Sequence, residues 1–207
     1  LLQRFAIELK DALDGVTDPK KRLQVLVNYF TLELGFRGSR MEYYNRANSY
    51  LNEVIDDREG LPISLSVLFI ELAGKAGLKV EGIGVPRHFI VRYKPEKEEA
   101  TLLDVFDDCK AITLEDASRL SGTALTSASL VASSRRGILE RMIRNLVNVS
   151  TIERDVQSLL RYLDLLLLVR KDAAHERWQR AVLRARTGQP AGAAEDLDWL
   201  IEHHPEG

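Results

Sequence analysis

The chain has 207 residues, of which 45% are hydrophobic and 29% charged, and its formal net charge is −2. This composition is typical of a soluble globular protein, and the length fits one domain with an appendage or two small domains. The near-neutral charge gives no global case for binding to nucleic acid or to an anionic membrane.

Two further observations restrict the compartment and the chemistry. The longest nearly apolar run, residues 162–169, is much shorter than the roughly 20 residues that cross a bilayer. Cys109 is the only cysteine, so no intrachain disulfide and no cysteine-rich metal site can form within these residues. We therefore expect a cytoplasmic protein without a cofactor, with neither a nucleic-acid nor a membrane partner.

Apolar residues recur at helical spacing in three segments of the N-terminal third. Residues 2–14 predict a helix that Gly15 ends, and residues 19–34 predict a second helix that Gly35 ends. The segment around residues 51–55 predicts a third helix, with Asn48 or Ser49 as its N-cap.

The next predicted helix begins at Pro62, because proline at the first helical position gives up no hydrogen bond. Its residues are apolar nearly all round as far as Ala76, and Gly77 provides a C-cap. A helix without a polar face belongs in the middle of a core rather than on a surface.

Three strands are predicted behind this helix, over residues 79–85, 89–93 and 100–106, which are rich in β-branched and aromatic side chains. Thr113 begins a short capped helix to Leu120, and the small polar residues 121–134 are interpreted as a linker. Residues 1–134 are therefore predicted to form an α+β domain with a buried helix and a small antiparallel sheet.

From Arg135 to the end every apolar pattern is helical. Leu163-Asp164-Leu165-Leu166 recurs further along the chain as Leu197-Asp198-Trp199-Leu200. The spacing of the two copies matches the period of tetratricopeptide helix pairs. We expect Leu197 to be a packing residue and Pro205 to end the last unit. Residues 135–207 thus predict an all-α tetratricopeptide-like region; the alternative is plain helical packing onto the first domain.

Residues 135–186 contain 12 Lys or Arg residues against six acidic ones. Solvated helix faces explain such an excess, and a surface for an acidic partner is the alternative. No aromatic residues alternate with the basic ones as they do in a nucleic-acid platform.

The central stretch resembles the SirB1-type branch of the transglutaminase-like superfamily. The matching residues run through 43–45, 48–51, 54–55, 58–65, 77–78, 84–86, 88–92 and 104–107. The resemblance implies a transglutaminase-like, papain-like domain followed by tetratricopeptide repeats. One departure is that Phe106-Asp107, which glycine usually follows, is followed here by Asp108-Cys109.

The resemblance also implies where a catalytic site would lie. Such enzymes place a thiolate in the first turn of a helix, a His on a strand, and an Asp or Asn that orients the His. His88 and Asp104 match the second and third roles. The helix start has no cysteine, and Ser64 is the only nucleophile-type side chain in its first turn; capping or a bond to a backbone carbonyl is its bland interpretation.

Three other residues of the same stretch, Asn48, Arg58 and Arg92, are candidates for binding. Asn48 is a cap, a loop-organising amide or a binding group, and Asp104 could hold Arg58 or Arg92 instead of His88. Cys109 as the nucleophile would break the family geometry. A metal site built on His88, Asp104 and Asp107 lacks further ligands, so no metal is expected.

These observations leave two main functional hypotheses, with the oligomeric state open. The preferred one is a non-catalytic interaction protein that binds a protein or peptide through its helical tail. The alternative is a peptidase-like or amidase-like hydrolase or acyl-transfer enzyme that uses Ser64, His88 and Asp104, which requires Ser64 Oγ within roughly 3 Å of a His88 ring nitrogen. A third reading, a small-molecule pocket without chemistry, needs an apolar cleft beside His88.

Overall fold

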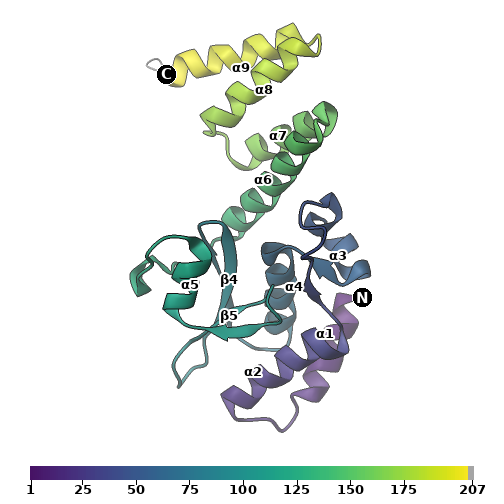
Figure 1. Cartoon of the computed structure of the whole chain (residues 1–207), viewed down its shortest axis with the longest axis vertical. Helices are drawn as coiled ribbons and strands as arrows, with labels where there is room; N and C mark the ends of the chain where they lie inside the picture. The colour runs from purple at the N-terminus through teal and green to yellow at the C-terminus, as the bar shows by residue number, and fades with distance from the viewer. Residues whose placement is uncertain (205–207) are drawn as a thin grey trace. The chain divides into compact units, whose positions relative to one another are not determined.

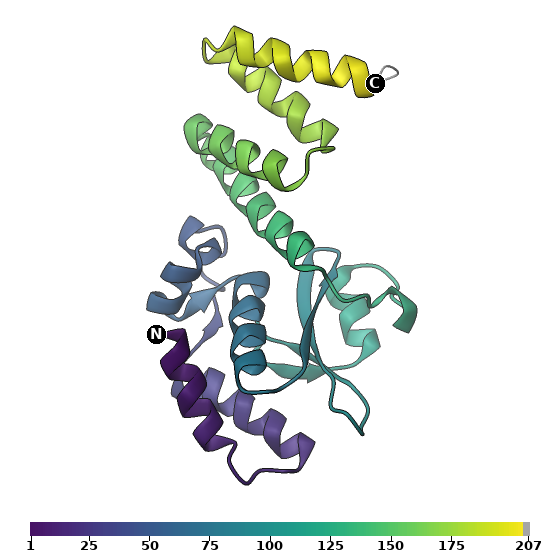
Figure 2. The ribbon, with the colours of Figure 1, turned by 180° about the vertical axis from the view of Figure 1, so that it is seen from behind.

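The computed structural model describes residues 1–204, so the predicted end of the last unit at Pro205 lies outside the described residues. The chain divides into two compact units, Leu1–Ser134 and a second that begins at Arg135 (Figures 1 and 2). The first unit is α+β and the second is helical, as predicted for the fold class. No helix in the described part of the chain is both long and apolar enough to span a membrane.

The N-terminal helices are α1 (Leu2–Ala12) and α2 (Pro19–Asn28), which continues as a π-helical turn, Tyr29–Glu33. Asp18 caps α2 by accepting a hydrogen bond from the Lys21 backbone N–H at 2.9 Å. A proline at the first position and an acidic N-cap explain why the helix begins there.

The predicted cap of α3 (Leu51–Asp57) is wrong. Asn48 and Ser49 lie inside a short 3₁₀ turn, Arg46–Ser49, which Asn45 caps through the Ala47 backbone N–H, and Tyr50 is the N-cap of α3. The strands β1 (Arg37–Gly38) and β2 (Glu59–Gly60) flank this region and pair in parallel. They were not predicted, because two-residue strands have no alternating pattern.

Helix α4 (Pro62–Lys75) is the centre of the first unit. Its residues Leu65, Leu68, Phe69 and Leu72 have 0% exposure, and each such side chain contributes roughly 1.5–3 kcal/mol by its removal from water. The helix packs against β3 and β4 on one side and α1 on the other, so it lies between a helical layer and the sheet (Figure 2).

The main sheet is antiparallel in the order β3-β4-β5-β6, with β3 at Val80–Val85, β4 at His88–Tyr93, β5 at Thr101–Asp104 and β6 at Lys110–Ile112. Strand β6 was not predicted, because its three residues are largely exposed. Helix α5 (Leu114–Ser121) follows, and Thr113 and Asp116 form the reciprocal bonds of a capping box, which confirms the predicted helix start.

Residues 121–134 are more ordered than the predicted linker. The Ser133 N–H donates to Gly82 O at 2.8 Å, and its Oγ accepts from the Gly84 N–H at 3.0 Å. A short 3₁₀ turn, Ser127–Ser129, precedes the buried Leu130. The segment is therefore attached to the free edge of β3.

The second unit consists of α6 (Arg135–Glu153), α7 (Val156–Val169), α8 (Ala174–Arg186) and α9 (Pro190–His203). Helix α9 begins and ends one tetratricopeptide period after α7, which agrees with the predicted repeat. Ala181 and Ala193 are buried where α8 meets α9. The prediction for Leu197 is wrong: it is 44% exposed, whereas its counterpart Leu163 is fully buried.

Candidate functional site

His88 and Asp104 are brought together by the pairing of β4 with β5. His88 is the first residue of β4 and Asp104 the last of β5, and His88 Nε2 lies 3.0 Å from Asp104 Oδ1. Both side chains are largely buried, at 12% and 5% exposure. Because an ionised carboxylate can only accept, Nε2 donates this bond and the ring is held in one orientation.

An aromatic side chain, Phe106, packs against His88. The Phe106 ring stands edge-on to the imidazole with centroids 6.3 Å apart, and the Tyr43 ring in turn has its centroid 6.0 Å from that of Phe106. The Arg40 guanidinium lies over the Phe106 ring at 5.8 Å and pairs with Asp107. Since the Phe106 N–H also donates to Asp104 at 3.1 Å, the turn that carries Phe106 is tied to the carboxylate.

Ser64 is completely buried in the first turn of α4, and its hydroxyl bonds to backbone. Ser64 Oγ accepts from the Leu61 N–H at 2.9 Å and donates to Asn48 O at 2.7 Å, with Leu61 O at 3.2 Å. Within residues 1–204 His88 is not among the hydrogen-bond partners of this hydroxyl. Ser64 therefore stabilises the helix start, as the third residue of a capping box does.

The three predicted binding residues take part in internal contacts. Asn48 is buried, and its side-chain N–H donates to Glu42 O at 2.6 Å, so it organises the preceding loop. Arg58 has a left-handed backbone with φ 62°, and its guanidinium lies over the rings of Phe5 and Phe36 at 5.1 and 4.8 Å.

Arg92 binds neighbouring residues instead of Asp104. Its Nη2 donates to Glu81 Oε2 at 2.7 Å, and its Nη1 donates to Leu130 O at 3.1 Å. The hydrogen bond from Arg92 lowers the pKa of Glu81. Arg92 thus attaches the segment around Leu130 to the sheet, and the alternative in which it holds Asp104 is wrong.

Cys109 lies in an environment that keeps its thiol protonated and unreactive. The thiol is 3% exposed and belongs to the main hydrophobic core. Burial raises the pKa of Cys109, and the carboxylates of Asp108 and Asp104 raise it further, whereas a nucleophilic cysteine needs a lowered pKa. The Asp108 that replaces the family's usual glycine has φ 52°, a conformation in which Asp is better tolerated than most residues.

A cavity of about 200 Å³ reaches Asp104 from the side of β6 and α5. Five of its seven lining residues are charged, namely Asp104, Asp107, Lys110, Asp116 and Arg119. His88 is not among the lining residues, so this cavity is not the cleft that a small-molecule pocket beside His88 requires. Among residues 1–204 no group of three or more His, Cys, Asp or Glu side chains is arranged to hold a metal ion.

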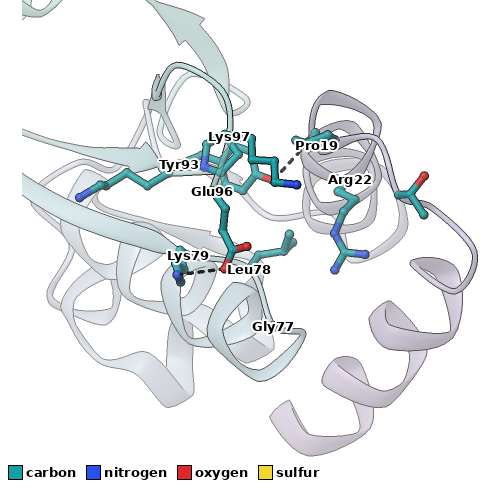
Figure 3. A pocket seen from close by; sticks show the side chains of 11 residues that line it. Pro19, Arg22, Gly77, Leu78, Lys79, Tyr93, Glu96 and Lys97 are labelled. Atoms are coloured by element: carbon teal, nitrogen blue, oxygen red, sulfur yellow. Dashed lines mark hydrogen bonds and ion pairs between the residues drawn. The ribbon is translucent and has the colours of Figure 1, made fainter.

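A second cavity, of about 330 Å³, lies between the start of α2, the end of α4 and the turn after β4 (Figure 3). Its charged lining residues are Arg22, Lys79, Lys94 and Lys97 against Glu96, which pairs with Lys79 at 3.4 Å. Burial raises the pKa of Tyr93, whose hydroxyl donates to Pro19 O at 3.3 Å. None of the candidate catalytic residues lines this cavity.

A further concave feature is an apolar groove of about 680 Å³ within the second unit, between α8 and α9. We call it the terminal groove, and its lining residues are Ala174, His175, Trp178, Leu197, Leu200, Ile201 and His204. The groove was not predicted from the sequence, because Leu197 was expected to be a packing residue. The buried residues Leu163, Leu166 and Leu167 of α7 correspond, one repeat later, to Leu197, Leu200 and Ile201. The repeat therefore identifies most of the apolar residues that line the groove.

The basic residues of the tail are largely paired with acids. Asp196 is 1% exposed and accepts from Arg177 at 3.2 Å, from Arg180 at 2.8 Å and from Arg184 at 3.1 Å. Arg144 pairs with Glu140 at 3.0 Å and also with Glu176. Much of the predicted basic excess therefore stabilises contacts between helices instead of forming a free basic surface.

The family model of the transglutaminase-like superfamily matches residues 1–144, and that of the tetratricopeptide repeat matches residues 148–207. Mouse F-box only protein 21 is 33% identical over 171 residues, which cover 77% of this chain and 27% of that protein. A UPF0162 protein of Xylella fastidiosa is 28% identical over 214 residues, which cover 99% of this chain and 76% of that protein.

The chain therefore spans about a quarter of the length of its F-box only protein 21 relatives. No solved structure is significantly similar to it. The match over residues 1–144 confirms the family that the residues around α4, His88 and Asp104 indicate. The chain belongs to the transglutaminase-like superfamily and carries tetratricopeptide repeats behind its transglutaminase-like domain.

Proposed function

We propose that this chain is a non-catalytic interaction protein, in which a transglutaminase-like domain without a nucleophile is joined to a helical tail that binds a protein or peptide. The supporting observation is the position of the Ser64 hydroxyl. It is fully buried and bonded to the backbone of Leu61 and Asn48 at the helix start where this superfamily needs a thiolate.

The chemistry of a hydroxyl supports the proposal. Attack on a carbonyl requires a base to remove the hydroxyl proton, and the Ser64 proton is donated to Asn48 O at 2.7 Å. The first turn of α4 offers only Pro62 and Ile63 besides Ser64. The positive end of a helix activates a thiol by lowering its pKa. This helix start has no thiol, so that means of activation is absent.

The interaction role rests on the tail. Tetratricopeptide repeats generally mediate protein–protein interaction, because stacked helix pairs present extended surfaces for a partner. We assign the tail, rather than the first domain, as the part that binds the partner.

The His88–Asp104 pair favours the alternative, a hydrolase or acyl-transfer enzyme. Its 3.0 Å bond is the base–orienter contact of a triad. For Ser64 to complete the triad, α4 would have to release the Leu61 and Asn48 backbone bonds.

A structural role and a nucleophilic role of Ser64 predict different effects of its replacement on the free energy of unfolding. We expect Ser64→Ala to lower the free energy of unfolding by about 1–2 kcal/mol, because Leu61 and Asn48 lose buried hydrogen bonds. Ser66 is equally buried in the same helix, but its hydroxyl makes no hydrogen bond within residues 1–204. Ser66→Ala should therefore be neutral or stabilising in urea unfolding followed by circular dichroism.

An enzyme's nucleophile is commonly held at a cost to stability, so its removal leaves stability unchanged or raises it. Equal stability of wild type and Ser64→Ala would contradict the structural role of this hydroxyl.

A further inference from the structure

The cavity between α2, α4 and the turn after β4 has a local excess of positive charge (Figure 3). We call it the basic cavity, and its charged lining residues are Arg22, Lys79, Lys94, Lys97 and Glu96. Four positive charges against one negative charge leave a net charge of +3, whereas the whole chain carries −2. Because cations gathered in a concave site attract and hold anions, this charge favours an anionic ligand.

Arg22 is the best-placed donor of the basic cavity. Its half-buried side chain donates from Nη1 to Val16 O at 2.9 Å, and no carboxylate among residues 1–204 pairs with it. Burial raises the pKa of Tyr93, and the nearby charge of Arg22 opposes this shift, so the guanidinium acts on the inner wall of the cavity. A guanidinium held in place with donors to spare suits the oxygens of a phosphate or a carboxylate.

The lysines of the basic cavity are held only by weak pairs. Lys79 pairs with Glu96 at 3.4 Å, but the two side chains are 72% and 78% exposed. Lys94 contacts Glu81 at 3.4 Å, and that carboxylate is already bound by Arg92 at 2.7 Å. Pairs of this kind contribute little to stability. The ammonium groups are therefore free to turn to an anion without breaking a contact on which the fold depends.

The start of α2 does not itself provide the site. Asp18 caps this helix by accepting from the Lys21 N–H at 2.9 Å, and Pro19 has no N–H to donate. The Asp18 carboxylate is not among the residues that line the cavity. Side chains, rather than the helix end, therefore carry the positive charge.

The size and the uncharged lining of the basic cavity define the class of ligand. Its volume of about 330 Å³ lies at the lower end of the range for small-molecule sites, roughly 300–1,000 Å³. Pro19, Leu78, Tyr93 and Pro95 form an apolar wall for an organic group. A phosphate monoester supplies up to two negative charges and three acceptor oxygens at neutral pH, which matches this cluster of cations better than a single carboxylate does.

We propose that the basic cavity binds a small phosphorylated organic compound. The phosphate lies against Arg22, with Lys79 and Lys97 as further cations, and the organic group contacts the apolar wall. This site goes beyond the interaction function proposed for the tail, because neither Ser64 nor any residue of the tail lines the cavity.

NMR titration of the isotope-labelled whole chain tests this site with three probes: phenyl phosphate, inorganic phosphate and phenol. We expect phenyl phosphate to give saturable shifts of the amide signals of residues 77–79, Lys94 and Lys97, which line the cavity. Inorganic phosphate should move the same signals but bind at least about threefold more weakly, because it lacks the group that the apolar wall holds. Phenol, which has no phosphate, should give no saturable shift.

Matched charge changes on α2 locate the phosphate. Arg22→Gln should weaken the binding of phenyl phosphate by about tenfold or more, since it removes a charge-assisted hydrogen bond. Lys20→Gln removes the same charge from an exposed position of the same helix outside the cavity, so it should change the affinity by less than about twofold.

Lys97→Gln is a second cavity variant and should weaken binding about threefold. Lys97 is exposed and forms no ion pair within residues 1–204, so its replacement should leave the fold intact. The spectrum of each variant outside the cavity reports whether the fold is kept.

Equal binding by wild type and Lys97→Gln, or by wild type and a folded Arg22→Gln, would overturn the proposal. Inorganic phosphate that binds as tightly as phenyl phosphate would do the same, because the apolar wall would then hold nothing. A hexaglutamate peptide that binds the same residues more tightly than phenyl phosphate would assign the cations to an acidic protein and also overturn it. None of these outcomes concerns Ser64 or the tail, so a failure here is distinct from a failure of the non-catalytic assignment.

Discussion

Asp196→Ala is expected to lower the free energy of unfolding of the helical tail by about 3–5 kcal/mol. The Asp196 carboxylate is 1% exposed and accepts hydrogen bonds from Arg177, Arg180 and Arg184. These three side chains are themselves 13–18% exposed. Removing the acid leaves Arg177 without an acidic partner, while Arg180 and Arg184 retain Asp164 as their only acidic partner in the described part of the chain.

Tryptophan fluorescence in urea measures this effect selectively, because both tryptophans, Trp178 and Trp199, belong to the tail. Asp198→Ala is the matched control on the same helix: this carboxylate is exposed and unpaired among residues 1–204, so its loss should change stability by less than about 0.5 kcal/mol. If the two variants unfold at the same urea concentration, the buried ion-pair cluster does not stabilise the tail.

Gly60→Ala should destabilise the first domain by about 1–3 kcal/mol through overpacking. A Cβ at Gly60 would lie 2.8 Å from Ser64 Oγ and 2.9 Å from Val54 Cγ1. The new methyl group therefore displaces either the hydroxyl that holds the start of α4 or the core side chain of α3.

Gly74→Ala, in the same domain, is the control, because it is expected to change the stability in the opposite direction. Gly74 lies near the end of α4, and a Cβ there meets nothing within 4 Å. Alanine should stabilise the helix by roughly 0.5–1 kcal/mol, because glycine costs more conformational entropy. Differential scanning calorimetry of both variants should show transitions moved in opposite directions. A Gly60→Ala transition at or above the wild-type temperature would show that the close contacts at Gly60 relax without cost.

The spacing of apolar residues and the capping, proline and glycine residues in the sequence predict much of the architecture. The continuous apolar surface of α4, its start at Pro62, the capping box at Thr113 and the repeat interval between α7 and α9 are local signals, and each corresponds to an observed element. The same holds for β3 to β5, where β-branched and aromatic residues dominate.

The observed features that were not predicted from the sequence depend on contacts between residues far apart in the chain. Strands β1 and β2 exist only because Arg37 and Gly38 meet Glu59 and Gly60, and no pattern in either segment announces this pairing. The exposure of Leu197 could not be read from its residue type, because Leu163 occupies the same repeat position and is buried. What covers a repeat is decided by its neighbour, not by its own sequence.

The candidate site divides in the same way. The resemblance placed His88 and Asp104 on neighbouring strands, and their side chains meet at 3.0 Å. The environment of Ser64 could not be predicted, because the Asn48 carbonyl that accepts its proton is 16 residues earlier in the chain.

The non-catalytic assignment is tested most directly by covalent labelling of the intact chain. The chain is incubated with a fluorophosphonate and with an activated acyl ester, and its mass is measured beside a serine hydrolase as positive control. We expect no adduct on Ser64, because its hydroxyl is buried and bonded to Asn48 and Leu61. A stoichiometric adduct that maps to Ser64, and that is absent in Ser64→Ala and in a His88→Ala variant, would contradict the account.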